Sequence, residues 1–371
     1  MRVLYVATSY PADNSDWRGV FIKHLAFALA EREDIELSMW TPPGPTPPHA
    51  NSISTPPENL WLRQLMHSGG IAHTMRSGGA GALLQPIRLL RFLRKLFERE
   101  QDIDLYHLNW LQTAIPLPGK GQPALITVLG TDLKLLGVPL VRQSLRRVMR
   151  KRAVTICPNA EWMVGPLRSA FGDLATIEAV PFGIDPVWFE LERAPDHDNP
   201  KWLVVTRLTR DKLGPLFEWS RPLFEGSNRQ LHLIGPMQEA LPVPAWVHYH
   251  GSASPEQLAQ RFFPTAHGLI TLSEHAEGRP QVMLEAMAAR LPIIASDMPA
   301  HAGIVEDHAT GFLCNNVSAY ASALAQLEEP PVNQQFGETS RTWVKTEIGT
   351  WTDCAQRYVN LYTQLKARAC A

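Results

Sequence analysis

The chain has 371 residues, of which 45% are hydrophobic and 19% charged, a composition typical of a globular protein long enough for two domains. Its formal net charge of -1 provides no overall field for nucleic acid, so we expect no nucleic-acid partner. No apolar run reaches the roughly 18 residues of a membrane-spanning helix, and the first ten residues fit a strand better than a signal peptide.

Strand-like apolar runs alternate with helix-length segments through the first half of the chain. A strand at residues 2–8 precedes a helix at 20–32 and a strand at 35–40. Prolines up to Pro56 and Pro57 then predict a long loop that is neither helix nor central strand, and the glycine-rich residues 68–82 predict a mobile loop. Basic helices and further strands follow, the helices at 83–100 and 140–153 and the strands at 104–109, 124–130, 154–157 and 176–182.

The alternation restarts after Gly183. Further strands are predicted at 201–208, 231–235, 246–251, 268–273, 291–296 and 311–314, and a terminal helix at 350–369. Such alternation predicts an α/β fold of two Rossmann-like, doubly wound parallel sheets, with a proline-rich and charged linker at 180–200. Ligands of such sheets lie outside the carboxyl ends of the strands, so we expect a site in a cleft between two facing domains.

Two cations follow the strand at 201–208. Arg207 and Lys212 precede Gly214, and a planar guanidinium together with an ammonium suits a diphosphate. Taken alone, the two side chains are equally well explained as exposed surface cations.

The segment from Ser273 to Leu291 holds two carboxylates, Glu277 and Glu285, and a proline that suits the first turn of a helix. We expect the backbone amides of Arg279 and of residues 281–283 to be free, which forms an anion site. Glu285 stands among apolar residues and a buried carboxylate needs a partner. The alternative is that both glutamates lie on the solvated surface.

Other residues of the chain have a spacing or placement that could suit a metal ion. Asp102 with Asp104, and Asp196 with Asp198, have a spacing that suits a divalent cation, but we interpret both pairs as solvated. His248 and His250 share one strand face, and no third ligand is near in sequence, which favours a structural or base-pocket role. We expect no metal and no cofactor.

At these residues the sequence resembles the family 4 retaining glycosyltransferases, which have the GT-B fold. The resemblance rests on the Glu-x7-Glu motif in "EGRPQVMLEA", on Arg207 and Lys212 in "RLTRDK", on "VPFGID" at 180–185, and on Gly19 in "SYPADNSDWRGVF". It implies an acceptor domain at 1–183, a donor domain at 184–345, and a helix at 346–371 that crosses back to the first domain.

The resemblance also implies an activity, the metal-independent transfer of a hexose with retention, for bacterial polysaccharide, lipopolysaccharide or glycolipid synthesis. Glu277 would contact the sugar and Glu285 the ribose, and Glu277, Arg207 and Lys212 form the implied catalytic set. The implied donor contacts are Gly19, Arg207, Lys212, Gly278, Arg279, Pro280, Gln281, Val282 and Glu285. The alternatives are a nucleotide-sugar epimerase or hydrolase of the same fold, and a non-catalytic assembly protein.

The acceptor side is expected at the strand ends of the first half, with His107, Asn109 and Asp132 as candidates. Many relatives carry a histidine where this chain has Leu129, so the usual acceptor contact is missing. Each candidate is equally well explained as a strand-end residue whose hydrogen bonds are satisfied within the fold.

Two basic helices stand out in this near-neutral chain. A basic amphipathic helix suits an anionic membrane surface, and a solvated helix face is the alternative. The cysteines have no metal-like spacing, which fits reduced thiols in a cytosol, so we expect a cytoplasmic protein with or without peripheral attachment to the inner face of the plasma membrane. The candidate membrane residues are Arg88, Arg91, Arg94, Lys95, Arg142, Arg146, Arg147, Arg150 and Lys151.

Overall fold

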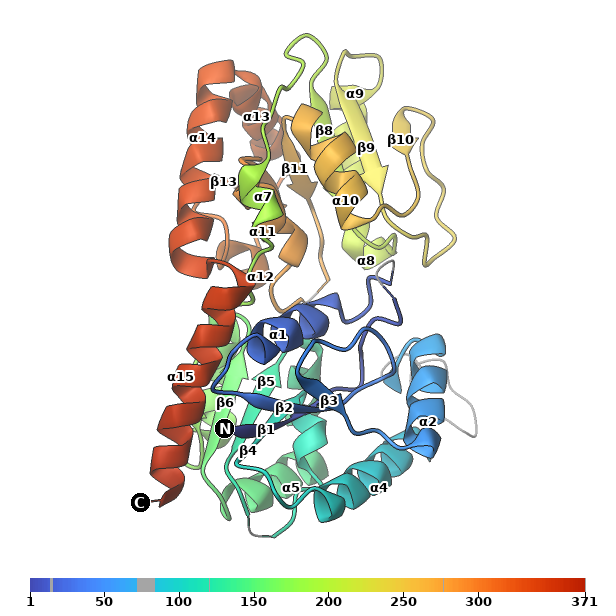
Figure 1. Cartoon of the computed structure of the whole chain (residues 1–371). Helices are drawn as coiled ribbons and strands as arrows, with labels where there is room; N and C mark the ends of the chain where they lie inside the picture. The colour runs from blue at the N-terminus through green and yellow to red at the C-terminus, as the bar shows by residue number, and fades with distance from the viewer. Residues whose placement is uncertain (14–15, 72–83, 120, 276, 371) are drawn as a thin grey trace. The chain divides into compact units, whose positions relative to one another are not determined.

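The computed structural model describes residues 1–13, 16–71, 84–119, 121–275 and 277–370. The chain divides into two compact units, unit 1 with Met1–Phe182 and Trp351–Ala371, and unit 2 with Gly183–Thr350. Each unit is a parallel sheet covered by helices on both faces (Figure 1). This is the predicted α/β class.

The sheet of unit 1 has seven strands in the order β3-β2-β1-β4-β5-β6-β7, and every recorded pairing is parallel. Its inner strands are buried apolar runs, which is why the sequence pattern located them. The strands are β1 (Arg2–Val6), β2 (Glu36–Trp40), β3 (Ala50–Ser52), β4 (Leu105–Asn109), β5 (Ala124–Val128), β6 (Val154–Pro158) and β7 (Thr176–Ile177).

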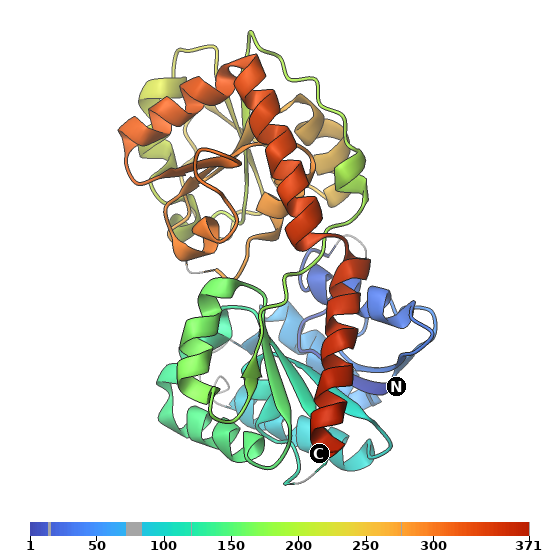
Figure 2. The same ribbon diagram turned by 90° about the vertical axis from the view of Figure 1, so that its left-hand side faces the viewer.

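Helices cover the two faces of this sheet. α1 (Val20–Ala30) and α15 (Trp351–Cys370) pack side by side on one face, against alternate strand residues that include Val3 and Tyr5 (Figure 1, Figure 2). The opposite face, with Leu4 and Val6, packs against α2 (Pro56–His67), α4 (Leu84–Arg99), α5 (Pro139–Met149) and α6 (Val164–Phe171). The alternation of side chains along each strand thus divides the core in two.

Polar contacts fasten α15 to the sheet. The Tyr362 hydroxyl lies 2.5 Å from Nδ1 of His107 on β4, and the Lys366 ammonium lies 3.2 Å from the Asp104 carboxylate. Asp104 also accepts a hydrogen bond from the backbone N–H of Arg2 at 2.8 Å. The interpretation of Asp104 as solvated holds only in part, because its side chain is 29% exposed and tertiary contacts give it two partners, whereas Asp102 is 85% exposed and pairs with Arg2.

The proline-rich segment differs from its prediction in part. Pro56 and Pro57 begin α2 instead of ending a loop, because the first helical turn needs no N–H from proline. Thr55 and Glu58 form a capping box there. β3 is an edge strand, which is consistent with the prediction that this segment forms no central strand. The predicted mobile loop at 68–82 lies mostly outside the described residues.

The sheet of unit 2 has six strands in the order β10-β9-β8-β11-β12-β13, and its recorded pairings are also parallel. The strands are β8 (Lys201–Val205), β9 (Gln230–Ile234), β10 (Val247–Tyr249), β11 (Gly268–Thr271), β12 (Ile293–Ser296) and β13 (Gly311–Cys314). Each lies within a predicted strand, except that β9 begins one residue before the predicted start.

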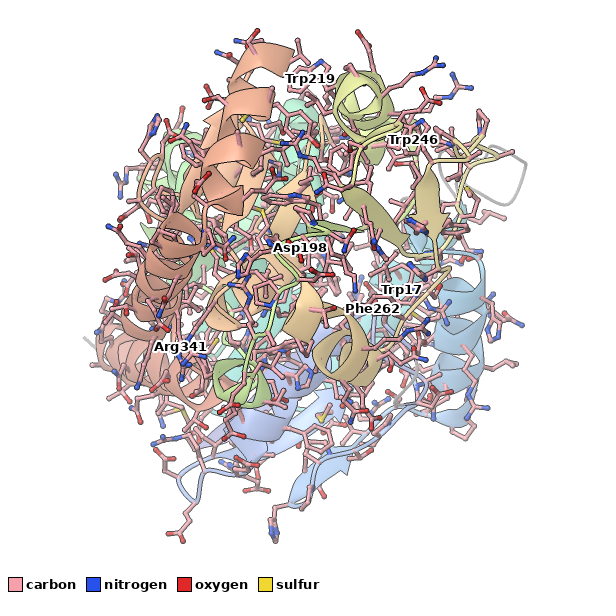
Figure 3. The ribbon with its side chains drawn as sticks, turned by 90° about the horizontal axis from the view of Figure 1, so that it is seen from above. Trp17, Asp198, Trp219, Trp246, Phe262 and Arg341 are labelled. Carbon is pink, nitrogen blue, oxygen red and sulfur yellow. The ribbon has the colours of Figure 1, made fainter. Side chains whose placement is uncertain are left out.

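Both faces of this second sheet are also covered. One core joins the sheet to α11 (Gln281–Ala288) and the other joins it to α9 (Leu216–Phe224), α13 (Val317–Glu328) and α14 (Pro330–Trp343). Trp246, labelled in Figure 3, stacks on Phe224 of α9 with ring centroids 6.3 Å apart.

A stack of imidazoles lies on β9 and β10. The ring of His232 is 4.8 Å from that of His248 and 5.0 Å from that of His250, and its Nδ1 is 2.9 Å from Nε2 of His250. Phe262, labelled in Figure 3, meets His250 edge-on. His232 on β9 is thus a neighbour of His248 and His250, although it lies too far from them in sequence to be predicted as one. Over the described part of the chain, no group of three or more His, Cys, Asp or Glu residues is placed to hold a metal ion.

Buried histidines make stability depend on pH. Burial lowers the pKa of His107 to about 3, and burial together with the neighbouring His248 lowers that of His232 to about 3. An unfolded histidine titrates near pH ~6.5. Below that pH the unfolded state binds protons that the folded state does not, so each such histidine lowers the free energy of unfolding by up to ~1.4 kcal/mol per pH unit.

We therefore expect the melting temperature to fall steadily between about pH 7 and pH 5. A scanning-calorimetry series over this range measures the effect. His232→Asn should flatten the dependence for the transition of unit 2, because one titrating group is gone. The same pH dependence in the parent and in His232→Asn would contradict the neutral, buried state of His232, because this comparison is independent of carboxyl groups that titrate over the same range.

Candidate functional site

The loop after β8 brings Lys212 to the carboxyl edge of the second sheet. α8 (Arg210–Leu213) is a single turn, and the hydroxyl of its N-cap residue Thr209 accepts a hydrogen bond from the backbone N–H of Lys212 at 3.3 Å. Gly214 ends this turn with φ at +50°, and a Cβ there would lie 2.1 Å from the carbonyl oxygen of Leu272. Only glycine permits this close approach of the loop to the end of β11.

An ion pair joins this loop to the one after β11. The Lys212 ammonium contacts the Glu277 carboxylate, and the two side chains are only 9% and 19% exposed. Burial lowers the pKa of Lys212, Glu277 opposes that shift, and the nearby Arg207 reinforces it. The backbone N–H of Glu274 donates to the Asp211 carbonyl at 2.8 Å, which fixes the two loops. The structure thus brings Arg207, Lys212 and Glu277 together.

The start of α11 differs from its prediction. Pro280 is the N-cap residue instead of the first helical residue, and its carbonyl accepts a hydrogen bond from the backbone N–H of Met283 at 3.3 Å. The amide of Met283 is therefore not free for an anion. No described residue accepts from the backbone N–H groups of Gln281 and Val282, which are the donors that remain at this helix start. The Gln281 side chain donates to the Gly183 carbonyl at 2.7 Å.

Glu285 lies on the second turn of α11 between the buried residues Leu284 and Ala286. Its side chain keeps some exposed surface, and among the described residues none donates a hydrogen bond or forms an ion pair to its carboxylate. Burial raises the pKa of Glu285 to about 7, and the nearby Asp185 adds to the shift. A carboxylate in this state is stabilised by any hydroxyl that donates to it.

The structure adds a histidine that sequence reasoning missed. His301 is fully buried after β12, and its Nδ1 lies 3.0 Å from the carbonyl of Ser296. The Ser296 hydroxyl donates to the Ser273 carbonyl at 2.6 Å, which ties β12 to β11. A carbonyl can only accept, so Nδ1 carries the proton and Nε2 is an acceptor, which has no partner in the described part of the chain.

His301 interacts electrostatically with both Glu277 and Lys212, and burial lowers the pKa of its imidazole. The ring is therefore neutral at pH 7 and lies near the ion pair. The only sequence signal was a polar residue shortly after a predicted strand, which is too common to single out this histidine.

The predicted acceptor-side residues of unit 1 are engaged within the fold. Both ring nitrogens of the fully buried His107 have partners, Tyr362 and Thr127. The carboxylate of Asp132 accepts from the backbone N–H groups of Leu111, Leu129 and Gly130, although burial raises its pKa to about 6. These contacts favour structural roles for His107 and Asp132.

Asn109 is only partly satisfied within the described part of the fold. Its Nδ2 donates to the Val6 carbonyl at 3.0 Å, while its buried Oδ1 has no partner among the described residues. The backbone of the next residue, Trp110, has a φ of +72°, an unusual conformation for a residue with a bulky side chain. Asn109 therefore stays an acceptor-side prediction.

Two further positions singled out in the sequence, Gly19 and Asp196, lie in other segments of the chain. Gly19 is the N-cap of α1 in unit 1, with φ at +68°, and a Cβ there would lie 2.8 Å from Ser9. Its contact with a donor phosphate stays a prediction. Asp196 closes an exposed turn by accepting from the backbone N–H groups of Asp198 and Asn199, which agrees with its interpretation as solvated. No helix of the described residues is both long and apolar enough to cross a membrane.

The state of Glu285 leads to a stability experiment. The pKa of its folded-state carboxyl lies above the ordinary value of ~4.3, so stability is lost as the pH rises through about 7 and the buried group ionises. Glu285→Gln keeps the size and removes the charge. At about pH 8 we expect this variant to have a free energy of unfolding that is higher than that of the parent by up to about 3 kcal/mol, and so to melt at a higher temperature. The difference should shrink toward pH 5.

The matched control is Glu274→Gln, which changes an exposed carboxylate in the loop before α11. Thermal unfolding of both variants across this pH range makes the comparison. A loss of stability in Glu285→Gln at every pH would show that the carboxylate has a stabilising partner in the ligand-free protein.

Comparisons with known proteins bear on the fold and on part of the chain. Residues 223–343 match the model of the family described as glycosyl transferases group 1. No curated protein sequence matches the chain. Among solved structures, a sucrose-phosphate synthase from Thermosynechococcus elongatus is 18% identical with a TM-score of 0.73, and the alignment covers 99% of this chain and 100% of that one.

Two further structures are similar over nearly their whole length. Anabaena HepE in complex with UDP is 13% identical, with a TM-score of 0.67 and coverage of 98% and 100%. A glycosyltransferase from Rickettsia africae is 11% identical, with a TM-score of 0.66 and coverage of 98% of each chain. At these identities the likeness shows the fold alone. The chain thus has the GT-B type of fold, two Rossmann-like parallel-sheet units, and its residues 223–343 match the group 1 glycosyl transferase family.

Proposed function

We propose that the chain is a retaining glycosyltransferase that moves a hexose from a nucleotide-diphosphate sugar to a glycan or lipid-linked acceptor. The observation that carries the proposal is the largely buried Lys212–Glu277 pair at the carboxyl edge of β8 and β11, together with the carboxylate of Glu285 on the helix that follows, which has no partner among the described residues. The family match over 223–343 includes both glutamates. Similar structures were solved with UDP and with UDP-glucose.

The proposed donor lies along these groups. Arg207, Lys212 and the backbone N–H groups of Gln281 and Val282 would bind the diphosphate, because a guanidinium, an ammonium and a helix start all favour negative charge. Glu277 would accept from hydroxyls of the sugar and Glu285 from those of the ribose. The proposal also keeps Gly19, Gly278, Arg279 and Pro280 as donor contacts.

The proposed chemistry relies on electrostatics. When the bond between the sugar and the phosphate breaks, negative charge grows on the departing nucleoside diphosphate. Arg207 and Lys212 would stabilise that charge with no metal ion required. The acceptor hydroxyl would attack the face that the phosphate leaves, and the departing phosphate would take the hydroxyl proton, which retains the anomeric configuration.

The acceptor is proposed to lie on unit 1. A lipid-linked acceptor would place the reaction at the inner face of the plasma membrane, in polysaccharide, lipopolysaccharide or glycolipid synthesis. The basic helices α4 and α5 would be the surface through which a cytoplasmic chain reaches it.

The test is a transfer assay with a screened nucleotide sugar and acceptor. Glu277→Ala should lower kcat/KM by about a hundredfold or more, because it removes an interaction with the reacting sugar and leaves Lys212 without its partner. Glu274→Ala, in the same loop but exposed, should leave kcat/KM unchanged. Full-rate transfer by Glu277→Ala would refute the assignment.

Two measurements separate the alternatives. In the transfer assay, conversion of the donor without an acceptor would favour a nucleotide-sugar epimerase or hydrolase. In calorimetry, failure to bind any nucleoside diphosphate would favour a non-catalytic protein. NMR of the product reports whether the anomeric configuration is retained, and an unchanged rate in the presence of a chelator is the result expected without a metal.

A further inference from the structure

The basic residues of unit 1 divide into two sets. Several have internal partners: Arg94 pairs with Glu98, Arg99 with Glu58 and Glu100, and Arg146 with Asp173. Arg152 is buried and donates to the carbonyls of Pro118 and Gln122. A second set is exposed and, in the described part of the chain, has no acidic partner; it comprises Arg88, Arg91, Lys95, Arg142, Arg147 and Lys151.

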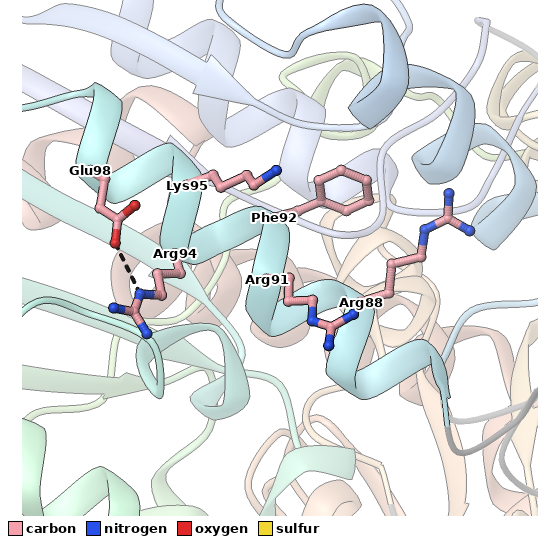
Figure 4. A pocket seen from close by; sticks show the side chains of 6 residues that line it. All are labelled: Arg88, Arg91, Phe92, Arg94, Lys95 and Glu98. Carbon is pink, nitrogen blue, oxygen red and sulfur yellow. Dashed lines mark hydrogen bonds and ion pairs between the residues drawn. The ribbon is translucent and has the colours of Figure 1, made fainter.

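α4 presents this charge beside exposed apolar surface. Figure 4 shows Arg88, Arg91, Arg94 and Lys95 along the helix around Phe92, where they line a groove of about 540 Å³ with Glu98 as its one acidic residue. Leu84 and Ile87, on the first turn of the same helix, are 61% and 48% exposed. Large apolar side chains rimmed by cations are unusual on a surface that meets only water.

A second groove connects α4 to the following loop. It has a volume of about 630 Å³, and its apolar wall includes Ile87, Leu90, Ile115, Pro116 and Leu117. Arg91, Arg94 and Glu98 also line this groove. An apolar channel with cations at its edge matches a molecule that has a hydrocarbon part and an anionic part.

The residues that directly follow α5 continue the same surface. Gly119 lines the second groove together with Arg91 and Arg94, and the Lys151 ammonium lies 3.4 Å from where a Cβ of Gly119 would be. Arg152 holds the loop in this place through the carbonyl of Pro118. The two basic helices, which are separate clusters in the sequence, therefore meet at residues 115–119.

We infer that this surface, formed by α4, residues 115–119 and the residues that directly follow α5, docks on an anionic lipid bilayer. The exposed arginines and lysines would bind headgroup phosphates, and Leu84, Ile87 and the apolar groove would enter the region of the acyl chains. The near-zero net charge of the chain makes this local field the attractive feature. The inference rests on the proposed function only for the identity of the acceptor, since docking requires no nucleotide.

The test is sedimentation of the full chain with phosphatidylcholine vesicles, with and without phosphatidylglycerol. We expect binding only to the anionic vesicles, with the affinity falling as salt is added. The triple variant Arg88→Gln, Arg91→Gln, Lys95→Gln should lower the partition constant by roughly a hundredfold. Arg63→Gln, Arg221→Gln, Lys345→Gln removes three exposed cations elsewhere and should bind like the parent.

A variant and a matched control test the contribution of the exposed apolar side chains. Leu84→Ser should weaken the binding that remains at high salt, whereas Leu60→Ser, which changes a side chain on α2 with 60% exposure, should not. Equal loss in the control variants, or equal binding to vesicles without phosphatidylglycerol, would overturn the inference. So would the absence of vesicle binding combined with retention of the chain by an acidic protein partner.

The outcomes also separate docking from the proposed activity. The α4 variants should bind a nucleoside diphosphate as the parent does, because they change no donor group. Normal nucleotide binding without vesicle binding would refute docking alone, and vesicle binding without nucleotide binding would refute the transferase proposal alone. Thermal unfolding of each variant checks that it is folded.

Discussion

The site of unit 2 depends on one interaction, the ion pair between Lys212 and Glu277. Both side chains are largely buried, and removing one partner of such a pair leaves an uncompensated charge. A ligand that separates them must therefore supply an anion for the ammonium and hydroxyl donors for the carboxylate. A sugar diphosphate carries both groups side by side, whereas a simple anion or a free sugar carries only one.

The surrounding structure serves to hold this pair. Gly214 lets the loop after β8 approach the end of β11, and the Thr209 hydroxyl fixes the turn that carries Lys212. On the other side, the Ser296 hydroxyl ties β12 to β11. Glu285 is not satisfied internally, because its carboxylate, like Nε2 of His301, has no partner in the described residues, and burial raises its pKa to about 7. A fold tolerates such a cost at a ligand site more readily than in a core.

The sequence predicted the fold well because buried parallel strands are continuous apolar runs, as in β1, β5 and β12, and these need no tertiary information. It also singled out Lys212, Glu277 and Glu285 through spacing and resemblance. It misjudged groups whose state depends on distant residues. Asp104 is paired because α15 returns to β4, and Met283 loses its free amide because Pro280 caps the helix. His301 lies near the ion pair only because β12 adjoins β11.

Calorimetric titration of Glu277→Gln with a nucleoside diphosphate and with the matching nucleotide sugar tests the central claim most directly. If the donor replaces the ion pair, this variant frees Lys212, so it should bind the nucleoside diphosphate at least as tightly as the parent does. The additional affinity that the parent gains from the sugar should be smaller in this variant. Lys212→Met should weaken both ligands. Loss of nucleoside diphosphate binding in Glu277→Gln, or unchanged binding of both ligands in both variants, would contradict the account.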